Sequence, residues 1–177
     1  LLAATEEERF NRIKHWAGFP VESIRYCLKE AGVELADVEH IAINTDPKAN
    51  LFKKLSFTIK QRPNIKMALD RIQNKKKRAA VEDEIANAFP EQNFTGTSHQ
   101  IEHHLSHLAS AHLVSPFKDS VALSIDGFGD FSSAAWGACT GTEINVDHRV
   151  FFPHSMGILY QAMTQFIGFP NYGDEYK

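Results

Sequence analysis

The amino-acid sequence predicts a mixed α/β domain, because helical and strand-like patterns alternate along its 177 residues. Residues 21–31 place apolar side chains at helical spacing, with Pro20 in front of them and Gly32 in the usual C-terminal capping position. Residues 40–44 are a short apolar run, which predicts a buried strand. Residues 120–152 carry β-rich runs and a turn signal, which predict further strands.

In this second half of the chain, the β-rich runs at 120–125 and 144–152 predict the two strands of a hairpin. The stretch between them, 132–140, is small and apolar, and Gly141 begins a turn signal. Residues 156–167 follow with apolar side chains at helical spacing, so we expect an amphipathic helix there.

Residues 50–90 have a different texture, with basic side chains among regularly spaced apolar ones. This pattern predicts two helices that are split near Pro63, each with one apolar stripe. The basic run 75–78 favours a solvated helix face over a contact with phosphate or RNA. We therefore expect one domain over residues 1–177, with 50–90 as a helical insertion.

Composition argues against several classes of protein. There are 19 basic and 22 acidic residues, and this net charge of −3 speaks against a general binder of nucleic acid or of membrane surfaces. No apolar run approaches the roughly 20 residues that span a bilayer, and residues 1–5 lack the features of a signal peptide. The two cysteines form no Cys-x-x-Cys pair, so we expect a reducing, cytoplasmic setting. The first residue is Leu1 rather than Met, and we expect truncation at both ends.

Five of the nine histidines fall between His99 and His112. On a helix, residues four apart share one face with Cβ atoms about 5–6 Å apart, so His103 and His107 can present two imidazoles to one metal ion. His104 lies off that face, and the general-base glutamate of a His-Glu-x-x-His zinc protease is missing. Paired imidazoles suit iron, zinc, copper and nickel alike, and we expect an oxygen ligand from elsewhere in the chain together with an open position.

A glycine-rich run ends the first strand of the predicted hairpin, and its residues are Asp126, Gly127, Phe128, Gly129 and Asp130. Glycines at such a point let backbone N–H groups approach an anion, and the two aspartates can hold Mg²⁺, a phosphate-bound metal or a hydroxyl. An ordinary hairpin turn explains the same pattern. Near the end of the chain, Gly173, Asp174 and Glu175 can line a nucleotide pocket or form a plain loop.

Five motifs in order resemble the N-terminal part of the O-carbamoyltransferases that act on nodulation factors and on antibiotics such as aminoglycosides and cephamycins. The motifs lie at residues 7–28, His103-His104-x-x-His107-x-x-Ser110-Ala111, Asp126-Gly127-x-Gly129-Asp130, Ser155-Met156-Gly157-x-Leu159-Tyr160 and Gly173-Asp174-Glu175-Tyr176-Lys177. The resemblance covers nearly the whole chain apart from residues 50–90.

This resemblance implies an actin/hexokinase/Hsp70-like fold, related to the enzyme that attaches threonylcarbamoyl to tRNA. It implies that carbamoyl phosphate and ATP give a carbamoyl-adenylate in a separate C-terminal domain. The N-terminal domain then moves the carbamoyl group to a hydroxyl of a sugar-like or natural-product acceptor. A divalent metal assists as a Lewis acid, with iron implied first and zinc as the alternative.

Carried to this chain, the resemblance makes His103 and His107 metal ligands, together with an aspartate much later in the polypeptide. Asp126 then lies beside the metal, where it binds the carbamoyl group or orients the hydroxyl, and either Asp126 or His104 takes the hydroxyl proton. The residues implied to contact phosphate are Gly127, Gly129 and Asp130, and those implied to contact the nucleoside are Gly173 and Glu175. Without the C-terminal domain of the same polypeptide, we expect no turnover from this piece alone.

Two other interpretations stand beside this one. The first is a nucleotide-dependent relative of the same fold, either a sugar kinase or a tRNA threonylcarbamoyl transferase. A kinase does not need the histidine pair, and a tRNA enzyme should be more basic than a net charge of −3. The second is a metal-binding fragment without turnover.

Overall fold

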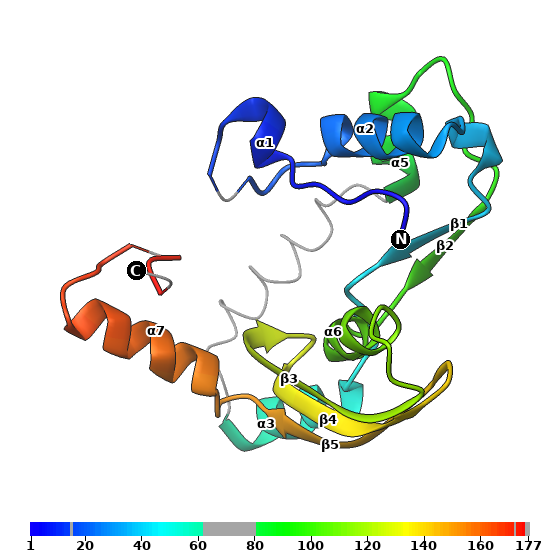
Figure 1. Ribbon diagram of the computed structural model, residues 1–177. Coiled ribbons are helices and arrows are strands. Elements are labelled where there is room, and N and C mark those ends of the chain that lie inside the picture. The colour runs from blue at the N-terminus through cyan, green and yellow to red at the C-terminus, as the bar shows by residue number, and fades with distance from the viewer. Residues whose placement is uncertain (15, 62–80, 172, 176–177) are drawn as a thin grey trace. The chain divides into compact units, whose positions relative to one another are not determined.

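The computed structural model describes residues 1–14, 16–61, 81–171 and 173–175 (Figure 1). It confirms the mixed α/β composition. The chain divides into two compact units, one formed by Leu1–Ala42 and Pro63–His99 and the other by Ile43–Arg62 and Gln100–Lys177. In the described part of the chain, no helix combines the length and the apolar character needed to cross a membrane.

The first unit is built from short helices around a small apolar core. Its elements are α1 (Glu8–Asn11), α2 (Val21–Ala31), the 3-10 helix η1 (Leu35–Asp37), α5 (Val81–Ala88) and most of the strands β1 (His40–Ile43) and β2 (Thr97–Gln100). The buried residues of the core are Leu35, Ile85 and Phe89. The helix predicted after Pro20 is confirmed, and Gly32 ends it with a φ of 67°, a left-handed conformation that glycine adopts without steric cost.

Strands β1 and β2 form a two-stranded sheet. The amide of Thr97 donates to the carbonyl of Glu39, and the amide of Ile101 donates to that of Ile43, both at 2.8 Å. Because both partners advance in the same direction along the sequence, the strands run parallel, and parallel strands need a long crossover between them. The strand predicted at 40–44 is present, but the prediction that it is buried was wrong: its residues are alternately exposed and half-buried, because a sheet of two strands leaves much of its surface open.

Helices α3 (Leu51–Gln61) and α5 lie within the segment 50–90, for which the sequence predicts helices. The split near Pro63 and the basic run 75–78 lie outside the described residues. That this segment is an insertion stays a prediction.

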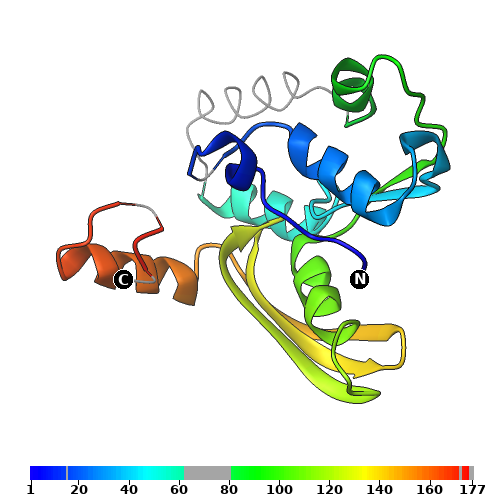
Figure 2. The same ribbon diagram turned by 45° about the horizontal axis from the view of Figure 1, so that its top comes forward.

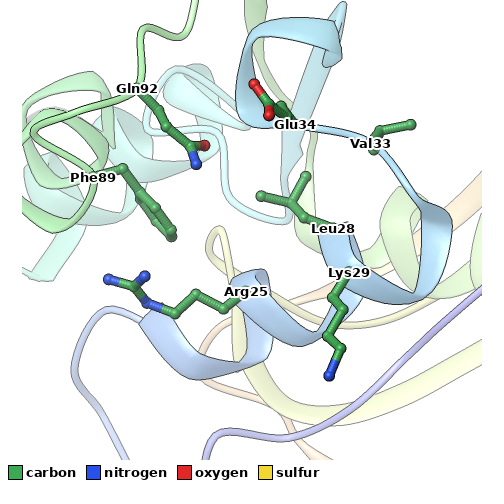
Figure 3. A pocket seen from close by; sticks show the side chains of 7 residues that line it. All are labelled: Arg25, Leu28, Lys29, Val33, Glu34, Phe89 and Gln92. Carbon is green, nitrogen blue, oxygen red and sulfur yellow. The ribbon is translucent and has the colours of Figure 1, made fainter.

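The first unit has an open pocket of about 260 Å³ on its surface (Figure 3). Its lining residues are Arg25, Leu28, Lys29, Val33, Glu34, Phe89 and Gln92. The Arg25 guanidinium lies over the Phe89 ring, 5.0 Å from its centroid, and so covers an apolar part of the wall. None of the histidines that the sequence singled out lines this cavity.

The N-terminus of α2 is capped by a distant side chain. The amides of Glu22 and Ser23 donate to the two carboxylate oxygens of Glu7, at 3.2 and 2.8 Å. Partial burial would raise the pKa of Glu7, but these hydrogen bonds outweigh it and hold the pKa below its ordinary value of 4.5. Glu7 thus joins the first helical segment to α2 and satisfies amides that have no partner within the helix.

We expect Glu7→Gln to lower the free energy of unfolding by about 0.5–1 kcal/mol at neutral pH, the lower part of the range for a lost cap because the site is open to solvent. A folded-state pKa below the unfolded one contributes stability above pH 4.5, and this contribution is lost as the pH falls through the folded value. Urea unfolding of both proteins at about pH 7 and about pH 3 measures it. An equal difference at both pH values would contradict this origin.

The second unit is built on an antiparallel sheet in the order β3-β4-β5, followed by a helix. Its elements are α3, α6 (His103–His112), β3 (Asp119–Gly129), β4 (Ser132–Thr140), β5 (Glu143–Phe151) and α7 (Met156–Phe166). Leu108 of α6 packs on the sheet against Ala122, Ala135 and Cys139. The predicted helix at 156–167 is confirmed.

The prediction of a two-stranded hairpin was wrong, because residues 132–140 are the central strand of three (Figure 1). This stretch has one β-branched residue, Thr140, at its end and otherwise consists mostly of small residues of low β-propensity. It is the most deeply buried strand of the unit, with Ser132, Ala134 and Ala135 all enclosed. Small side chains are needed where α6 packs closely on the sheet. Because small residues have low β-propensity, propensity alone does not predict this strand.

Candidate metal centre

Helix α6 presents His103 and His107 on one face, as the i,i+4 spacing predicts. Their Nε2 atoms lie 3.1 Å apart. The helix begins at this point because Glu102 caps it: its carboxylate accepts the amide of Leu105 at 2.9 Å and also pairs with Arg149 at 3.3 Å. The first turn of α6 is therefore held in place from both sides.

Asp126 joins the histidine pair because β3 is irregular there. Ile125 pairs with Ala134 and Gly129 pairs with Ser132, so residues 126–128 face a single residue of β4. Such a bulge redirects side chains and is common next to active sites. It brings Asp126 Oδ2 to 2.8 Å from His103 Nε2 and to 3.5 Å from His107 Nε2.

These three donor atoms fit one divalent transition metal. They all lie within 4.8 Å of one another. Donors that share a metal at about 2.1 Å each lie about 3–3.4 Å apart, close to the separations seen here. Two imidazoles and one carboxylate are the donor set of non-haem iron(II) sites and of some catalytic zinc sites. The side chains of His107 and Asp126 are 46% and 41% exposed, so the cluster is open to a substrate.

The backbone selects the tautomer of His103. Its Nδ1 lies 3.2 Å from the carbonyl oxygen of Asn44, an acceptor that requires the proton to be on Nδ1. Nε2 of His103 then carries a lone pair that faces the carboxylate of Asp126, and Nε2 of His107 lies beside it. Such a convergence of electron pairs calls for a cation or an added proton, and a backbone carbonyl behind the ligand is typical of metal-bound histidine.

The carboxylate of Asp126 is kept ionised. Partial burial would raise its pKa. The hydrogen bond with His103, which requires the added proton on Nε2, the hydrogen bond from the Gly127 amide and the charges of the two imidazoles outweigh burial and hold the pKa below its ordinary value of 3.8. The Gly127 amide lies 2.6 Å from Oδ1. Oδ1 is thus occupied by the backbone, and Oδ2 is the oxygen that faces the histidines.

The start of α7 clamps the bulge from the other side. Ser155 caps the helix, accepting the amide of Ile158 at 3.1 Å, and its hydroxyl lies within hydrogen-bond distance of the carbonyls of Asp126 and Gly127, at 3.1 and 2.8 Å. A Cβ atom on Gly157 would overlap the Asp126 carbonyl. The Ser-Met-Gly motif therefore supports the backbone that aims Asp126.

The two glycines of the motif have different surroundings. A Cβ on Gly129 would overlap the ring of His103, whereas a Cβ on Gly127 would meet only the Cδ1 atom of Ile158, at 3.7 Å. We expected both glycines to face phosphate. In the structure, the lack of a side chain at Gly129 makes room for the metal-ligand candidate His103, and Gly127 donates its amide to Asp126.

Asp130, also expected to face phosphate, has its carboxylate occupied by donors of its own chain. Oδ1 accepts the hydroxyl of Thr45 at 3.0 Å, and Oδ2 accepts the amides of Asp46 at 2.7 Å and His103 at 3.0 Å. Asp130 and Phe131 both have positive φ, 47° and 75°, as in the tight turns that favour right-twisted hairpins. Asp130 therefore ties the loop after β1 to the first residue of α6.

We expect Asp130→Asn to destabilise the protein by about 1–3 kcal/mol and to weaken metal binding. Asparagine adopts positive φ as readily as aspartate, so the substitution tests the hydrogen bonds rather than the backbone. The amide has one acceptor oxygen and cannot serve all three donors. Chemical unfolding and a metal titration measure the two effects, and unchanged values for both would show that Asp130 does not hold His103.

The structure does not support the catalytic role expected for His104. This side chain is 0% exposed, and its Nδ1 lies 2.8 Å from the hydroxyl of Ser124 on the sheet. Burial lowers the pKa of His104, in part countered by the nearby backbone of Ser132 and by the charge of Glu102. His104 is an anchor of α6, as is the buried His112 on Ser120 at 2.8 Å.

The last predicted site residues lie beside α7. The hydroxyl of Tyr160 donates to the Glu175 carbonyl at 2.8 Å, and Asn171 donates to the buried carboxylate of Asp174. Gly173 has a φ of 82°, which favours glycine. The role of Gly173 and Glu175 toward a nucleoside stays a prediction.

Comparison with known proteins assigns the chain to a family. A family model described as the carbamoyltransferase N-terminus matches residues 1–177. The chain belongs to the carbamoyltransferase family. It is 35% identical over 180 residues to nodulation protein NolNO of Sinorhizobium fredii and 33% identical over 195 residues to an uncharacterized protein of Synechocystis. Both alignments cover the whole chain, but only 25% and 30% of those relatives.

A third relative, nodulation protein NolO of Bradyrhizobium diazoefficiens, is 37% identical over 79 residues, which are 44% of this chain and 14% of that protein. The chain thus spans about a quarter to a third of the length of the relatives that match all of it. The family membership confirms the resemblance drawn from the five motifs.

In this carbamoyltransferase-family chain, sequence reasoning missed the residues that position the ligands. The carbonyl of Asn44 and the hydroxyl of Thr45 follow β1 directly, some 60 residues before the histidines. A polar run at the end of a parallel strand is the signal that could have indicated them, because ligands gather at the carboxyl ends of such strands. Ser155 belongs to the Ser-Met-Gly motif, but the sequence did not predict that its hydroxyl holds the backbone of Asp126.

Proposed function

We propose that this chain is the metal-carrying N-terminal part of an O-carbamoyltransferase. The observation that carries the proposal is the convergence of His103 Nε2, His107 Nε2 and Asp126 Oδ2, with the carbonyl of Asn44 behind His103. Membership of the carbamoyltransferase family supports the reaction class. Because the matching relatives are much longer, the activity belongs to a longer polypeptide.

His103, His107 and Asp126 would hold a divalent metal, iron in the first place and zinc as the alternative. When bound, the metal supplies Lewis-acid polarisation of the carbamoyl oxygen. The family resemblance gives Asp126 a second role, in which it orients the acceptor hydroxyl or receives its proton. Because Oδ1 accepts the Gly127 amide, Asp126 plays this role through Oδ2 only when Oδ2 does not hold the metal. Asn44 and Asp130 keep His103 in one tautomer and one position, so that little reorganisation is needed.

The donor of the carbamoyl group is proposed to be a carbamoyl-adenylate made from carbamoyl phosphate and ATP in a C-terminal domain of the same polypeptide. The acceptor is proposed to be a hydroxyl of a sugar-like or natural-product molecule. We further propose that the described elements are part of an actin/hexokinase/Hsp70-like domain. The three antiparallel strands followed by a helix, and the separate parallel pair, are compatible with such a fold.

The test uses the full-length protein with carbamoyl phosphate, ATP, Fe²⁺ and a panel of hydroxylated acceptors, with products followed by mass spectrometry. We expect a carbamoylated acceptor and AMP, and no product from Asp126→Asn. Phosphorylated acceptor without carbamoylation would favour the sugar-kinase interpretation, and transfer to tRNA alone would favour the threonylcarbamoyl enzyme. Metal binding without any product would favour a fragment that only binds metal.

A further inference from the structure

A second pair of histidines lies outside the candidate metal centre. His40, at the start of β1, and His99, in β2, face each other with Nδ1 of His40 3.0 Å from Nε2 of His99. Both side chains are exposed. Their ring centroids are 5.0 Å apart and the rings are tilted by 55°, so the nitrogen atoms meet rather than the ring faces.

This separation suits a shared metal ion. Two donors at about 2.1 Å from one ion and at right angles to each other lie about 3 Å apart. The corresponding distance between His103 and His107 is 3.1 Å. A direct hydrogen bond between two neutral imidazoles in contact with water contributes little to stability, so that bond alone is a weak reason for the arrangement. An ion can replace the shared proton and bind both nitrogens.

The backbone already holds the two rings near each other. The amide of Thr97 donates to the carbonyl of Glu39, and this bond lies next to His40 on one strand and two residues before His99 on the other. Little conformational entropy is therefore lost when both rings bind one ion. Because the strands are paired, the second imidazole binds intramolecularly after the first, which raises the affinity above that of a single histidine.

We propose that His40 and His99 form a second metal site, for a divalent ion that favours imidazole, namely Zn²⁺, Ni²⁺ or Cu²⁺. In the described part of the chain, the only cluster of three or more candidate ligands is that of His103, His107 and Asp126. Water therefore completes the coordination at His40 and His99, and this site is the weaker of the two. The proposal is independent of the carbamoyl-transfer function.

The experiment titrates Zn²⁺, and separately Ni²⁺, into a protein that carries His103→Ala and His107→Ala, followed by isothermal calorimetry. We expect one ion to bind to this background. Adding His99→Gln or His40→Gln should weaken that binding about 100-fold. Adding His148→Ala, which removes another exposed histidine in the second unit, should leave it unchanged.

Two outcomes would overturn the proposal: no ion bound by the background protein, or an equal loss from His148→Ala and His99→Gln. Circular dichroism and thermal unfolding check that each variant is folded. NMR of the background protein needs no further substitution. There, Zn²⁺ should shift the imidazole signals of His40 and His99 before those of the other histidines, and shifts spread evenly over all of them would also refute the site.

Discussion

Replacing both His103 and His107 with alanine is expected to weaken metal binding by more than about 100-fold, which exceeds the usual cost of losing a single outer-sphere partner. The two Nε2 atoms are two of the three donors in the cluster, and Asp126 alone retains one oxygen toward the ion. Elemental analysis of the purified proteins and a titration with Fe²⁺ or Zn²⁺ measure the effect. In the full-length protein, carbamoyl transfer should be lost in parallel.

The matched control is His148→Ala, since His148 is an exposed histidine of the same unit whose ring centroid lies 5.5 Å from that of Trp136. It should keep its metal and its activity. In metal binding, Asp126→Asn is expected to lie between the two, because the amide can still offer an oxygen but carries no charge; its carbamoyl transfer should be lost. Equal metal content in the parent and the double variant would show that these histidines do not form the metal centre.

Gly129→Ala is the second substitution from which we expect a large effect. The new Cβ would overlap the ring of His103, and the rest of that ring's surroundings are already occupied by Asn44 and Asp126. We expect a loss of about 1–3 kcal/mol in the free energy of unfolding, as in other overpacked sites. We also expect metal binding to weaken about 10- to 100-fold, because the ligand must move.

Gly127→Ala provides the control within the same motif. Its Cβ would meet only Ile158 at an ordinary van der Waals distance of 3.7 Å, and Gly127 is not among the glycines with positive φ. We therefore expect it to bind metal like the parent. A phosphate-binding role for both glycines predicts instead that both substitutions impair ATP-dependent turnover while metal binding is kept. Metal titration of the two variants, beside their activities, separates these explanations.

Local patterns were enough for much of the fold. Helical spacing predicted α2 and α7, and the apolar run at 40–44 predicted β1. The central strand β4 was missed, because close packing against α6 demands small residues such as Ala134 and Ala135 rather than those of high β-propensity. β-Propensity describes the conformation that a segment favours by itself, whereas the burial of a central strand depends on the elements that pack around it.

Within the candidate site, the sequence by itself determined that His103 and His107 share one face, since an i,i+4 relation depends only on the helical period. Only the tertiary structure decided that Asp126 lies beside both histidines as a third candidate donor, that Gly129 makes room for His103, and that His104 is buried against the sheet. Each of these depends on contacts between residues more than 15 positions apart. A bulge in β3 and the packing of α6 on the sheet create those contacts, and neither leaves a periodic pattern in the sequence.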